Sequence, residues 1–465
     1  MAAPRFWEVL DRACNTGPRE PVKEFDLRVW KTTSRLAKEH EIRYDPANPV
    51  NCDDGLADDL WKAGVELYAE VGSYCMDSER VIRFDEREIK DGLREVRDGV
   101  TIGSGSEERT IHCRTLDDKS PPTIIGGIIE SDVPEGDMFV KVYQSIAQEP
   151  IIDGFYVGPP VQSAEGYKLR ITTPLEIHLG RCAAGWAREA IRRAGRPGLH
   201  LASACPSAAA DIASCDEAQG IRRTDAIVVP TTAELKTDYQ SLGKVAFSVD
   251  YGCLRNPYSC NVIGGWAGGP EGTAIVAVAC SIMSVMVYQN KSGQAYGEFM
   301  PMRMQPAIMT DRQATWGNSI CSQAIAKNSR IVNIMGITVA AGPGTEMMYY
   351  ETAENAVATI PSGSCGVGNV RRYKVKSLLG SPLENKFYAE AAYAATRLKR
   401  SDANEIVKAL LAKYESKITD EGGPLGYPFD EIYDMRTLTP KKEQVEIYDR
   451  VKKEVQDLGL EFNYP

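Results

Sequence analysis

From about residue 121 onward, the sequence alternates between short apolar runs and longer runs in which apolar residues recur at helical spacing. A short apolar run bounded by glycine or proline is typical of a strand buried on both faces, and the longer runs are typical of amphipathic helices. Eight such strand–helix units follow one another at a spacing of roughly 30 to 40 residues. The predicted strands are residues 123–127, 151–157, 199–204, 226–230, 260–265, 299–305, 334–341 and 365–370.

This repeat predicts a (β/α)₈ TIM barrel in which each strand runs parallel to its neighbours. A doubly wound open sheet is the alternative, but that fold rarely needs eight such units. We expect three parts along the chain: an N-terminal helical extension with a β-hairpin over residues 1–118, the barrel over 119–400, and a C-terminal helical segment packed on the barrel over 401–465.

Charge and hydropathy limit the partners of such a barrel. The chain has 54 basic and 64 acidic residues, which gives a net charge of −10. This balance argues against nucleic acid or an anionic membrane surface as a partner, because both attract basic patches. No run approaches about 18 apolar residues, which argues against a membrane span. Residues 1–7 lack an apolar signal core, so we expect a cytoplasmic protein.

The cysteines and the missing motifs limit the chemistry. Twelve cysteines are scattered through apolar segments without a CxxC pair, and there are only four histidines. These features argue against a disulfide framework and against a zinc site, so we predict no metal ligands. The chain also has no GxGxxG or GxxxxGK[ST] motif, which argues against a bound nucleotide.

The third predicted strand carries an unusual histidine. It follows a Gly-Arg-Pro-Gly turn at residues 195–198, and strand alternation places His200, Ala202 and Ala204 on one face and Ser203 on the other. Two alanines after a histidine leave space above the imidazole. We therefore predict that His200 and Ala202 point into the barrel, with His200 one layer deeper and an open cavity above Ala202. His200 would be a general base or hydrogen-bond donor beneath a substrate, or else a satisfied core histidine.

Charged residues near the carboxyl ends of the strands are the next candidates, because barrel active sites form at those ends. Glu234 and Glu346 each follow a strand, and we predict catalytic roles for them. The alternative is that each is an exposed glutamate at a helix start. Arg303 lies in an otherwise apolar strand, where its charge must be paired. It would clamp a carboxylate, or form a structural pair with Glu346.

Further substrate contacts are predicted at the same ends. Glycine-rich loops at residues 264–269 and 341–346 would let a ligand approach the backbone, or would simply form tight turns. Tyr251, Tyr258 and Trp266 would form an aromatic cage for a quaternary ammonium group, or belong to the core. The other predicted substrate-binding residues at these ends are Tyr156, Ser203 and Gln305.

Several segments together indicate a family. They are 195–198, 234–236, 264–269, 341–343, 345–347, 433–440 and 457–460. In this order and spacing, they make the chain resemble the monomethylamine:corrinoid protein methyltransferases of methylotrophic methanogens over its whole length. The resemblance implies a (β/α)₈ barrel that assembles as a homo-oligomer, a hexamer. It also implies transfer of a methyl group from an amine to the cobalt of a separate corrinoid protein. This chain would then bind no cofactor itself, since its cognate partner carries the corrinoid (cobalamin).

The sequence departs from that family at the position of its pyrrolysine. In the family, this residue lies on the third strand, four residues after the Gly-Arg-Pro-Gly turn, and captures the amine. Here the position is Ala202, which cannot do so. The resemblance also places a family glutamate near Tyr258 and a family amide near Gly336, so we predict that Ala202, Tyr258 and Gly336 bind the substrate. Glu234, Arg303 and Glu346 are retained.

These departures favour a pyrrolysine-independent methyltransferase that uses a pre-activated, quaternary N-methyl compound as its donor. A quaternary ammonium group already carries the positive charge that lets its nitrogen leave as a neutral amine. An S-methyl or O-methyl donor is a second possibility, although such donors usually need a zinc Lewis acid. The other alternative is a barrel that has lost methylamine chemistry and serves another reaction, or a binding or scaffold role.

Overall fold

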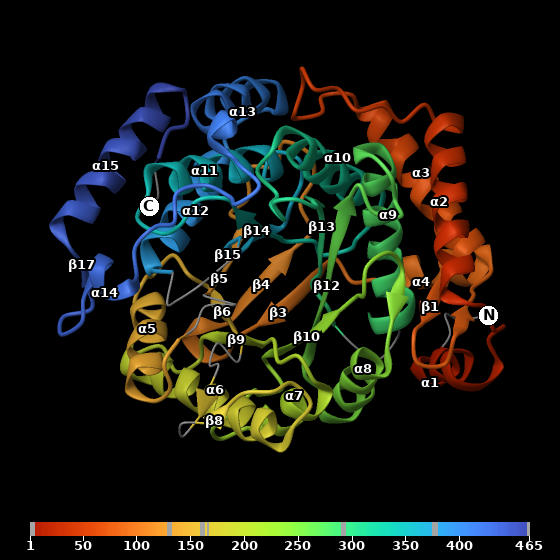
Figure 1. Cartoon of the computed structure of the whole chain (residues 1–465), viewed down its shortest axis with the longest axis horizontal. Coiled ribbons are helices and arrows are strands. Elements are labelled where there is room, and N and C mark those ends of the chain that lie inside the picture. The colour runs from red at the N-terminus through yellow and green to blue at the C-terminus, as the bar shows by residue number, and fades with distance from the viewer. Residues whose placement is uncertain are drawn as a thin grey trace.

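The structure, a computed structural model, describes residues 5–127, 133–158, 163–164, 167–289, 294–373 and 380–462. Eight strands form one sheet in the order β13-β12-β10-β9-β6-β5-β15-β14, and every paired neighbour is parallel. The two ends of this order meet where Gly297, just before β13, bridges to Asn333, just before β14. The strands therefore follow one another around a closed ring, and the predicted (β/α)₈ barrel is confirmed (Figure 1).

The barrel strands are short and buried on both faces, as their apolar composition predicts. They are β5 (Thr123–Gly127), β6 (Gly154–Val157), β9 (His200–Ser203), β10 (Ala226–Pro230), β12 (Leu254–Ile263), β13 (Glu298–Arg303), β14 (Met335–Val339) and β15 (Gly366–Arg372).

A ring of helices encloses the strands, with one helix after each strand (Figure 1). Their buried faces carry the alanine, leucine and aromatic residues that pack on the outside of the barrel. They are α5 (Asp137–Ala147), α6 (Pro174–Arg193), α7 (Ala208–Ser214), α8 (Tyr239–Tyr251), α9 (Pro270–Met283), α10 (Arg312–Asn328), α11 (Glu346–Thr359) and α12 (Pro382–Ala395).

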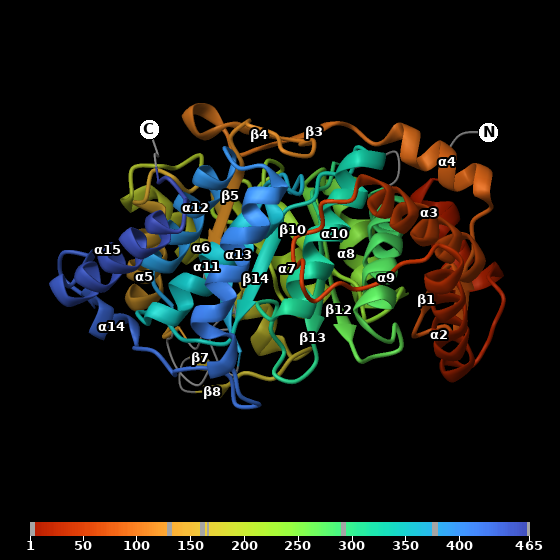
Figure 2. The same cartoon turned by 90° about the horizontal axis from the view of Figure 1, so that it is seen from above.

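The N-terminal segment covers one side and one end of the barrel. Helices α1 (Phe6–Asp11), α2 (Val22–Glu39), α3 (Asp54–Val71) and α4 (Glu86–Glu95) lie on the side of α9 (Figure 1). The predicted hairpin is present as β3 (Gly99–Ile102) paired antiparallel with β4 (Arg109–His112). It lies over the amino-terminal end of the barrel (Figure 2), where Val100, Ile102 and Ile111 join the interior core.

The C-terminal segment packs outside α11 and α12. It contains α13 (Arg400–Tyr414), α14 (Phe429–Ile432) and α15 (Lys442–Asp457). Small additional sheets are formed by β1 (Ser73–Cys75), β2 (Arg80–Ile82) and β11 (Lys236–Thr237), by β7 (Ser163–Ala164) and β8 (Tyr167–Lys168), and by β16 (Tyr433–Asp434) and β17 (Thr439–Pro440). Short non-α helices η1 (Arg12–Thr16), η2 (Gly105–Glu107), η3 (Ser284–Gln289) and η4 (Glu415–Lys417) complete the described elements.

Helix α9 continues directly into η3, so that Pro270–Gln289 forms one apolar segment of 20 residues with a mean hydropathy of 1.7. Our sequence expectation that no apolar run approaches the length of a membrane span therefore does not hold by length and composition. However, 94% of this segment is buried inside the protein, among side chains of α3 and α10. It is built into the core beside the barrel.

One strand boundary differs clearly from the prediction. Strand β12 begins at Leu254, six residues before the predicted start at residue 260, because Arg255 and Asn256 are polar residues within a buried strand. The guanidinium group of Arg255 donates to Ser248 Oγ at 2.6 Å and to the carbonyl groups of Tyr288 and Gln289 at 2.7 and 2.9 Å. These partners lie far away in the sequence or outside the strand, so the local pattern does not reveal them.

Candidate functional site

A cavity of about 270 Å³ opens at the carboxyl ends of the barrel strands. Residues from β6, β10, β12, β13 and β15 line it, together with the segment that follows β9. Its charged side chains are Lys244, Glu298 and Arg371, and its amides and phenols come from Asn256, Asn369, Tyr156 and Tyr258. This size suits a small metabolite, because pockets for larger ligands start at about 300 Å³.

Glu298 is the buried acid of this cavity. It is the first residue of β13, its side chain points into the barrel, and it is only 1% exposed. The hydroxyl group of Tyr156, on β6, donates a hydrogen bond to its Oε1 atom. Burial raises the pKa of Glu298, while the Tyr156 hydroxyl and the positive charge of Arg371 act in the opposite direction. The net effect is a raised pKa for Glu298.

Three polar atoms on buried side chains of this cavity have no hydrogen-bond partner among the residues that the structure describes. They are Oε2 of Glu298, Oδ1 of Asn256 and Nδ2 of Asn369. An unsatisfied buried polar atom costs about 1–3 kcal/mol, so such atoms are normally paired in a native protein. All three atoms belong to residues that line this cavity.

Arg371 reaches across the barrel mouth. It lies on β15, and its guanidinium carbon is 5.1 Å from the centre of the Tyr258 ring on β12. This arrangement is a cation–π contact, which orients the planar guanidinium group. Because the residue lies two positions beyond Asn369, it is roughly 6–7 Å closer to the mouth along the strand.

Lys244, the third charged lining residue, is already compensated. Its Nζ atom lies 2.7 Å from Oδ2 of Asp211 on α7 and donates to the carbonyl groups of Cys205 and Val228 at 2.7 and 3.2 Å. Both members of this pair are almost fully buried. Lys244 thus joins α8 to α7 and to the barrel wall, and Glu298 and Arg371 are the other charged groups of the cavity lining.

The third strand has the predicted orientation, with one correction. His200 and Ala202 face the barrel interior, and His200 is fully buried in the deeper layer. Its Nε2 atom is 2.9 Å from the Tyr296 hydroxyl and its Nδ1 atom is 3.1 Å from the carbonyl of Thr224. Burial lowers the pKa of His200 to about 3, so the ring is neutral. These contacts are those of a satisfied core histidine below the cavity.

Ala202 is not among the residues that line the described cavity. Ala202 is fully buried and packs within the interior core, and the cavity begins at Ala204. Tyr156 is the register partner of Ala202 on β6 and belongs to the same core cluster. Its side chain occupies the interior beside the alanine, which is the physical reason for the difference.

Ser203 points away from the cavity, as strand alternation requires for a neighbour of Ala202. Its hydroxyl group donates to Oδ1 of Asp211 at 2.5 Å, between the strand and α7. The side chain is buried on the outer face of the barrel. Ser203 therefore supports the Lys244–Asp211 pair and does not line the cavity.

Glu234 holds a loop in place. It is buried, and its Oε1 atom accepts a hydrogen bond from the backbone N–H of Ala267 at 3.1 Å. A Cβ atom on Gly265 would lie 2.6 Å from the same oxygen, so this glycine is needed for the approach of Glu234. Burial raises the pKa of Glu234. Trp266, in this loop, is 40% exposed and does not line the cavity.

Three other predicted residues lie outside the cavity lining. Arg303 is 38% exposed and does not line the cavity, and among the described residues its ion partner is Asp311, at 3.7 Å, rather than the predicted Glu346. Gln305 donates to the carbonyl of Asp420 at 3.1 Å. Glu346, at the start of α11, pairs with Arg450 on α15 and is about half exposed. This ion pair joins α11 of the barrel to α15 of the C-terminal segment.

The predicted aromatic cage is only partly assembled. Tyr258 lines the cavity, together with Tyr156. Tyr251 lies on α8, where its hydroxyl donates to the carbonyl of Ile221 at 2.8 Å. Since Trp266 also lies elsewhere, the two phenols of Tyr156 and Tyr258 form the aromatic part of the site.

Gly336 supports the site through its lack of a side chain. A Cβ atom at this position would lie 2.3 Å from Oε2 of Glu298. The glycine on β14 therefore provides the space that the carboxyl group occupies. Gly336 was predicted to lie beside the substrate, and in the structure it lies beside the carboxyl group of Glu298.

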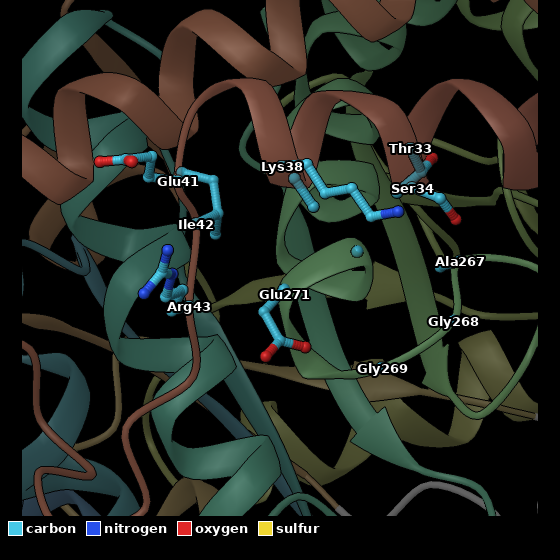
Figure 3. Close-up of a pocket in the computed structure, with 12 residues that line it drawn as sticks. Thr33, Ser34, Lys38, Glu41, Ile42, Arg43, Ala267, Gly268, Gly269 and Glu271 are labelled. Carbon is cyan, nitrogen blue, oxygen red and sulfur yellow. The ribbon is translucent and has the colours of Figure 1, made fainter.

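A second cavity of about 380 Å³ lies outside the barrel, between α2 and the start of α9 (Figure 3). Thr33, Ser34 and Lys38 project from α2 toward the loop of Ala267, and Glu271 lies opposite them (Figure 3). Oε1 of Glu271 accepts from the backbone N–H of Tyr44 at 3.1 Å. The glycines of this loop serve its turns, since Gly264 and Gly268 have φ values of +93° and +84°.

The polar cavity residues that sequence reasoning missed are Lys244, Asn256, Glu298, Asn369 and Arg371. One signal for Glu298 was available, because it alternates with Met300 and Met302 along an apolar strand. Arg371 likewise alternates with Asn369. Within the described ranges, no group of three or more histidine, cysteine, aspartate or glutamate residues is arranged to hold a metal ion.

The comparisons with known proteins agree with this architecture. A family model described as monomethylamine methyltransferase MtmB matches residues 5–460. The chain belongs to the monomethylamine methyltransferase MtmB family. Family membership makes the chain a methyltransferase, and the match extends beyond the barrel into both terminal segments.

Individual MtmB proteins are similar along most of the chain. The monomethylamine methyltransferase MtmB3 of Methanosarcina barkeri (strain Fusaro) is 29% identical over 464 residues, which cover 98% of each chain. MtmB2 of Methanosarcina acetivorans is 29% identical over 420 residues, or 89% of each chain. The crystal structures of the Methanosarcina barkeri enzyme and of a hydroxylamine MtmB complex both superimpose with a TM-score of 0.91. Both are 26% identical in sequence, with 98% of each chain covered.

Proposed function

We propose that this member of the MtmB family is a pyrrolysine-independent methyltransferase. Its donor is a pre-activated, quaternary N-methyl compound, and its acceptor is the Co(I) centre of a separate corrinoid protein. The family match supports the methyl-transfer class, and Ala202, at the position where the resemblance places pyrrolysine, motivates the choice of donor. The partner carries the corrinoid, and assembly as a homo-hexamer is part of the same proposal.

One observation carries this proposal: the cavity at the barrel mouth combines a buried acid with two phenol rings. Oε2 of Glu298 has no partner among the described residues, and the rings of Tyr156 and Tyr258 line the same space. A permanently positive head group provides the countercharge that a buried carboxylate needs. Phenol faces also attract quaternary ammonium groups.

The reaction is balanced without an oxidant or reductant beyond the acceptor itself. The bond between nitrogen and the methyl carbon breaks, and its electron pair remains on nitrogen, which leaves as a neutral tertiary amine. The methyl carbon forms its new bond with the electron pair of Co(I), which becomes Co(III). No proton transfer is required, because the quaternary nitrogen is already tetrahedral and cationic.

The role of this chain is to hold and orient the donor. Glu298 and the two tyrosines fix the cationic head, and the closed amino-terminal end of the barrel leaves the mouth as the approach for the acceptor. Positioning of this kind converts an encounter between two molecules into a reaction within one complex. A monomethylamine donor would need a group that makes its nitrogen cationic, which Ala202 does not provide.

The deciding experiment mixes the purified protein with its cognate corrinoid protein, reduced to Co(I), and a panel of methyl donors. We expect methyl-Co(III) to form with a quaternary ammonium donor, and not with monomethylamine or in the absence of the enzyme. Transfer from monomethylamine without an added cofactor would overturn the proposal. Transfer only from an S-methyl or O-methyl donor, or from no donor at all, would also overturn it.

A further inference from the structure

Two cysteines meet at the amino-terminal end of the barrel, opposite the cavity. Cys113 directly follows β4 of the hairpin, and Cys365 directly precedes β15. Both are free thiols in the structure. They are about 250 positions apart in the sequence, so no local pattern relates them.

Contacts between the two chain segments bring these cysteines together. The backbone N–H of Cys365 donates to the carbonyl group of Asn333 at 2.7 Å. A Cβ atom on Gly363 would lie 3.5 Å from the carbonyl oxygen of Thr115, so the chain after Cys113 passes close to the chain before Cys365. Cys365 belongs to the core cluster that the hairpin covers, and Cys113 packs against the same cluster.

The two thiols are in direct contact. The side chain of Cys113 forms a hydrogen bond with that of Cys365, and its Sγ atom also lies 3.0 Å from the carbonyl oxygen of Arg330. Cys365 is only 3% exposed, whereas Cys113 is partly exposed. A small oxidant can therefore approach the pair from the side of Cys113.

Cys365 is the more acidic member of the pair. The hydrogen bond from Cys113 lowers the pKa of Cys365, and burial acts in the opposite direction. The backbone N–H groups of Asn333 and Arg114 and the positive charge of Arg114 lower this pKa further. The contact with Cys365 and burial raise the pKa of Cys113. The negative charge of the pair is thus favoured on Cys365, and a thiolate is the reactive form of cysteine.

From this geometry we propose that Cys113 and Cys365 are an oxidisable dithiol, which hydrogen peroxide converts into a disulfide that fastens the hairpin to β15. The Cys365 thiolate attacks one peroxide oxygen, the O–O bond breaks, and hydroxide leaves, which gives a sulfenic acid. The Cys113 sulfur then attacks the Cys365 sulfur, and water leaves with the Cys113 proton and the sulfenic hydroxyl group. The two sulfur atoms lose two electrons, which reduce the peroxide. This inference does not depend on the proposed function.

Peroxide treatment of the native protein, followed by peptide mapping without reduction, tests this proposal. We expect a peptide that links Cys113 to Cys365 within one chain. The cross-link closes a loop of about 250 residues, so the oxidised chain should migrate faster on a non-reducing denaturing gel. The melting temperature should rise by about 2–4 °C. Dithiothreitol should reverse all three changes, because thiol–disulfide exchange restores the two thiols.

Three variants identify the residues involved. Cys113→Ser and Cys365→Ser should each abolish the linked peptide, the gel shift and the rise in melting temperature. Cys52→Ser is the matched control, because Cys52 is exposed and its Sγ atom lies 3.7 Å from the carbonyl oxygen of Val50. It should respond like the unaltered protein. Circular dichroism establishes that each variant is folded, and Cys113→Ser at its partly exposed position is decisive if Cys365→Ser does not fold.

Other results would overturn the inference. One is the absence of the linked peptide in the oxidised native protein. Another is a link only between two chains, or only between Cys215 and Cys253, whose thiols also interact. A linked peptide without any rise in melting temperature would show that the disulfide does not fasten the hairpin, which would also contradict the proposal.

Discussion

The hydroxyl group of Tyr156 donates a hydrogen bond to Glu298 from the opposite wall of the barrel. Strands β6 and β13 are four positions apart in the ring of eight, so this contact spans the interior. Tyr156 is also the register partner of Ala202. A long side chain at position 202 would compete with Tyr156 for the same space. The small alanine at this position therefore leaves room for the hydrogen bond between Tyr156 and Glu298.

Replacing Tyr156 tests this relationship. Tyr156→Phe leaves Oε1 of Glu298 without its donor inside the core, and we expect the free energy of unfolding to fall by about 1–3 kcal/mol. Donor affinity is expected to fall as well, because the carboxyl group loses its orientation. Tyr251→Phe is the control: it removes a hydroxyl that donates to Ile221 far from the cavity, so donor affinity should be unchanged. Urea denaturation and calorimetry measure the two effects, and equal donor affinities in both variants would contradict the prediction.

A substitution at Gly336 is a second way to displace the carboxyl group of Glu298. In Gly336→Ala the new Cβ atom would lie 2.3 Å from Oε2 of Glu298, so the carboxyl group must shift. We expect a loss of about 1–3 kcal/mol in stability and a clear loss of donor affinity. Gly185→Ala, on α6, meets no atom closer than 3.8 Å and should be neutral or slightly stabilising. An unchanged donor affinity in Gly336→Ala would show that the position of Glu298 does not matter for binding.

Removing only the lysine of the buried Lys244–Asp211 pair should strongly lower the free energy of unfolding. Lys244→Met leaves Asp211 as an uncompensated buried charge, and we expect a loss of about 3–5 kcal/mol in the free energy of unfolding. Lys327→Met is the control, because Lys327 and Asp58 are each about one-third exposed and their pair lies 2.8 Å apart near the surface. Its loss should stay within about 1 kcal/mol. Similar losses in both variants, measured by chemical denaturation, would refute this assignment.

Two glutamates of α11 should make stability depend on pH. Burial raises the pKa of Glu354 to about 8 and that of Glu351 to about 7, from an ordinary value of 4.5. Because the folded pKa values are raised, the stabilising contribution is complete below about pH 4.5 and is lost as the pH rises through 7 and 8. We therefore expect the free energy of unfolding to decrease from about pH 5 to pH 8. Glu354→Gln, which resembles the neutral acid, should flatten this decrease, and an unaltered pH profile would contradict the prediction.

The barrel was predictable because strand burial and helical spacing are local properties of the sequence. Glu298 and Arg371 each lie one residue outside a strand that the sequence predicted. The predicted strands ran over residues 299–305 and 365–370, whereas β13 begins at Glu298 and β15 extends to Arg372. Charged residues at strand ends are normally assigned to loops, so each boundary stopped one residue short of the site.

The directions of the other charged side chains could not be predicted in the same way. Glu234 and Glu346 both follow a strand, as expected, but their partners are non-local. Glu234 accepts from the loop at Ala267, and Glu346 pairs with Arg450 on the last long helix. Only the folded chain brings these partners together, so a position near the barrel mouth does not determine whether a side chain lines the cavity.

The hairpin of β3 and β4 has a kinetic consequence. Its residues Val100, Ile102 and Ile111 close the amino-terminal end of the barrel interior, and the donor cavity lies at the other end. In the part of the chain that the structure describes, the mouth is then the one entrance that the proposed donor, amine product and methyl acceptor would share. A docked corrinoid protein would block the exchange of small molecules, so the donor enters first and the amine leaves last. Initial-rate kinetics should accordingly show a compulsory-order ternary complex, with intersecting rather than parallel double-reciprocal lines.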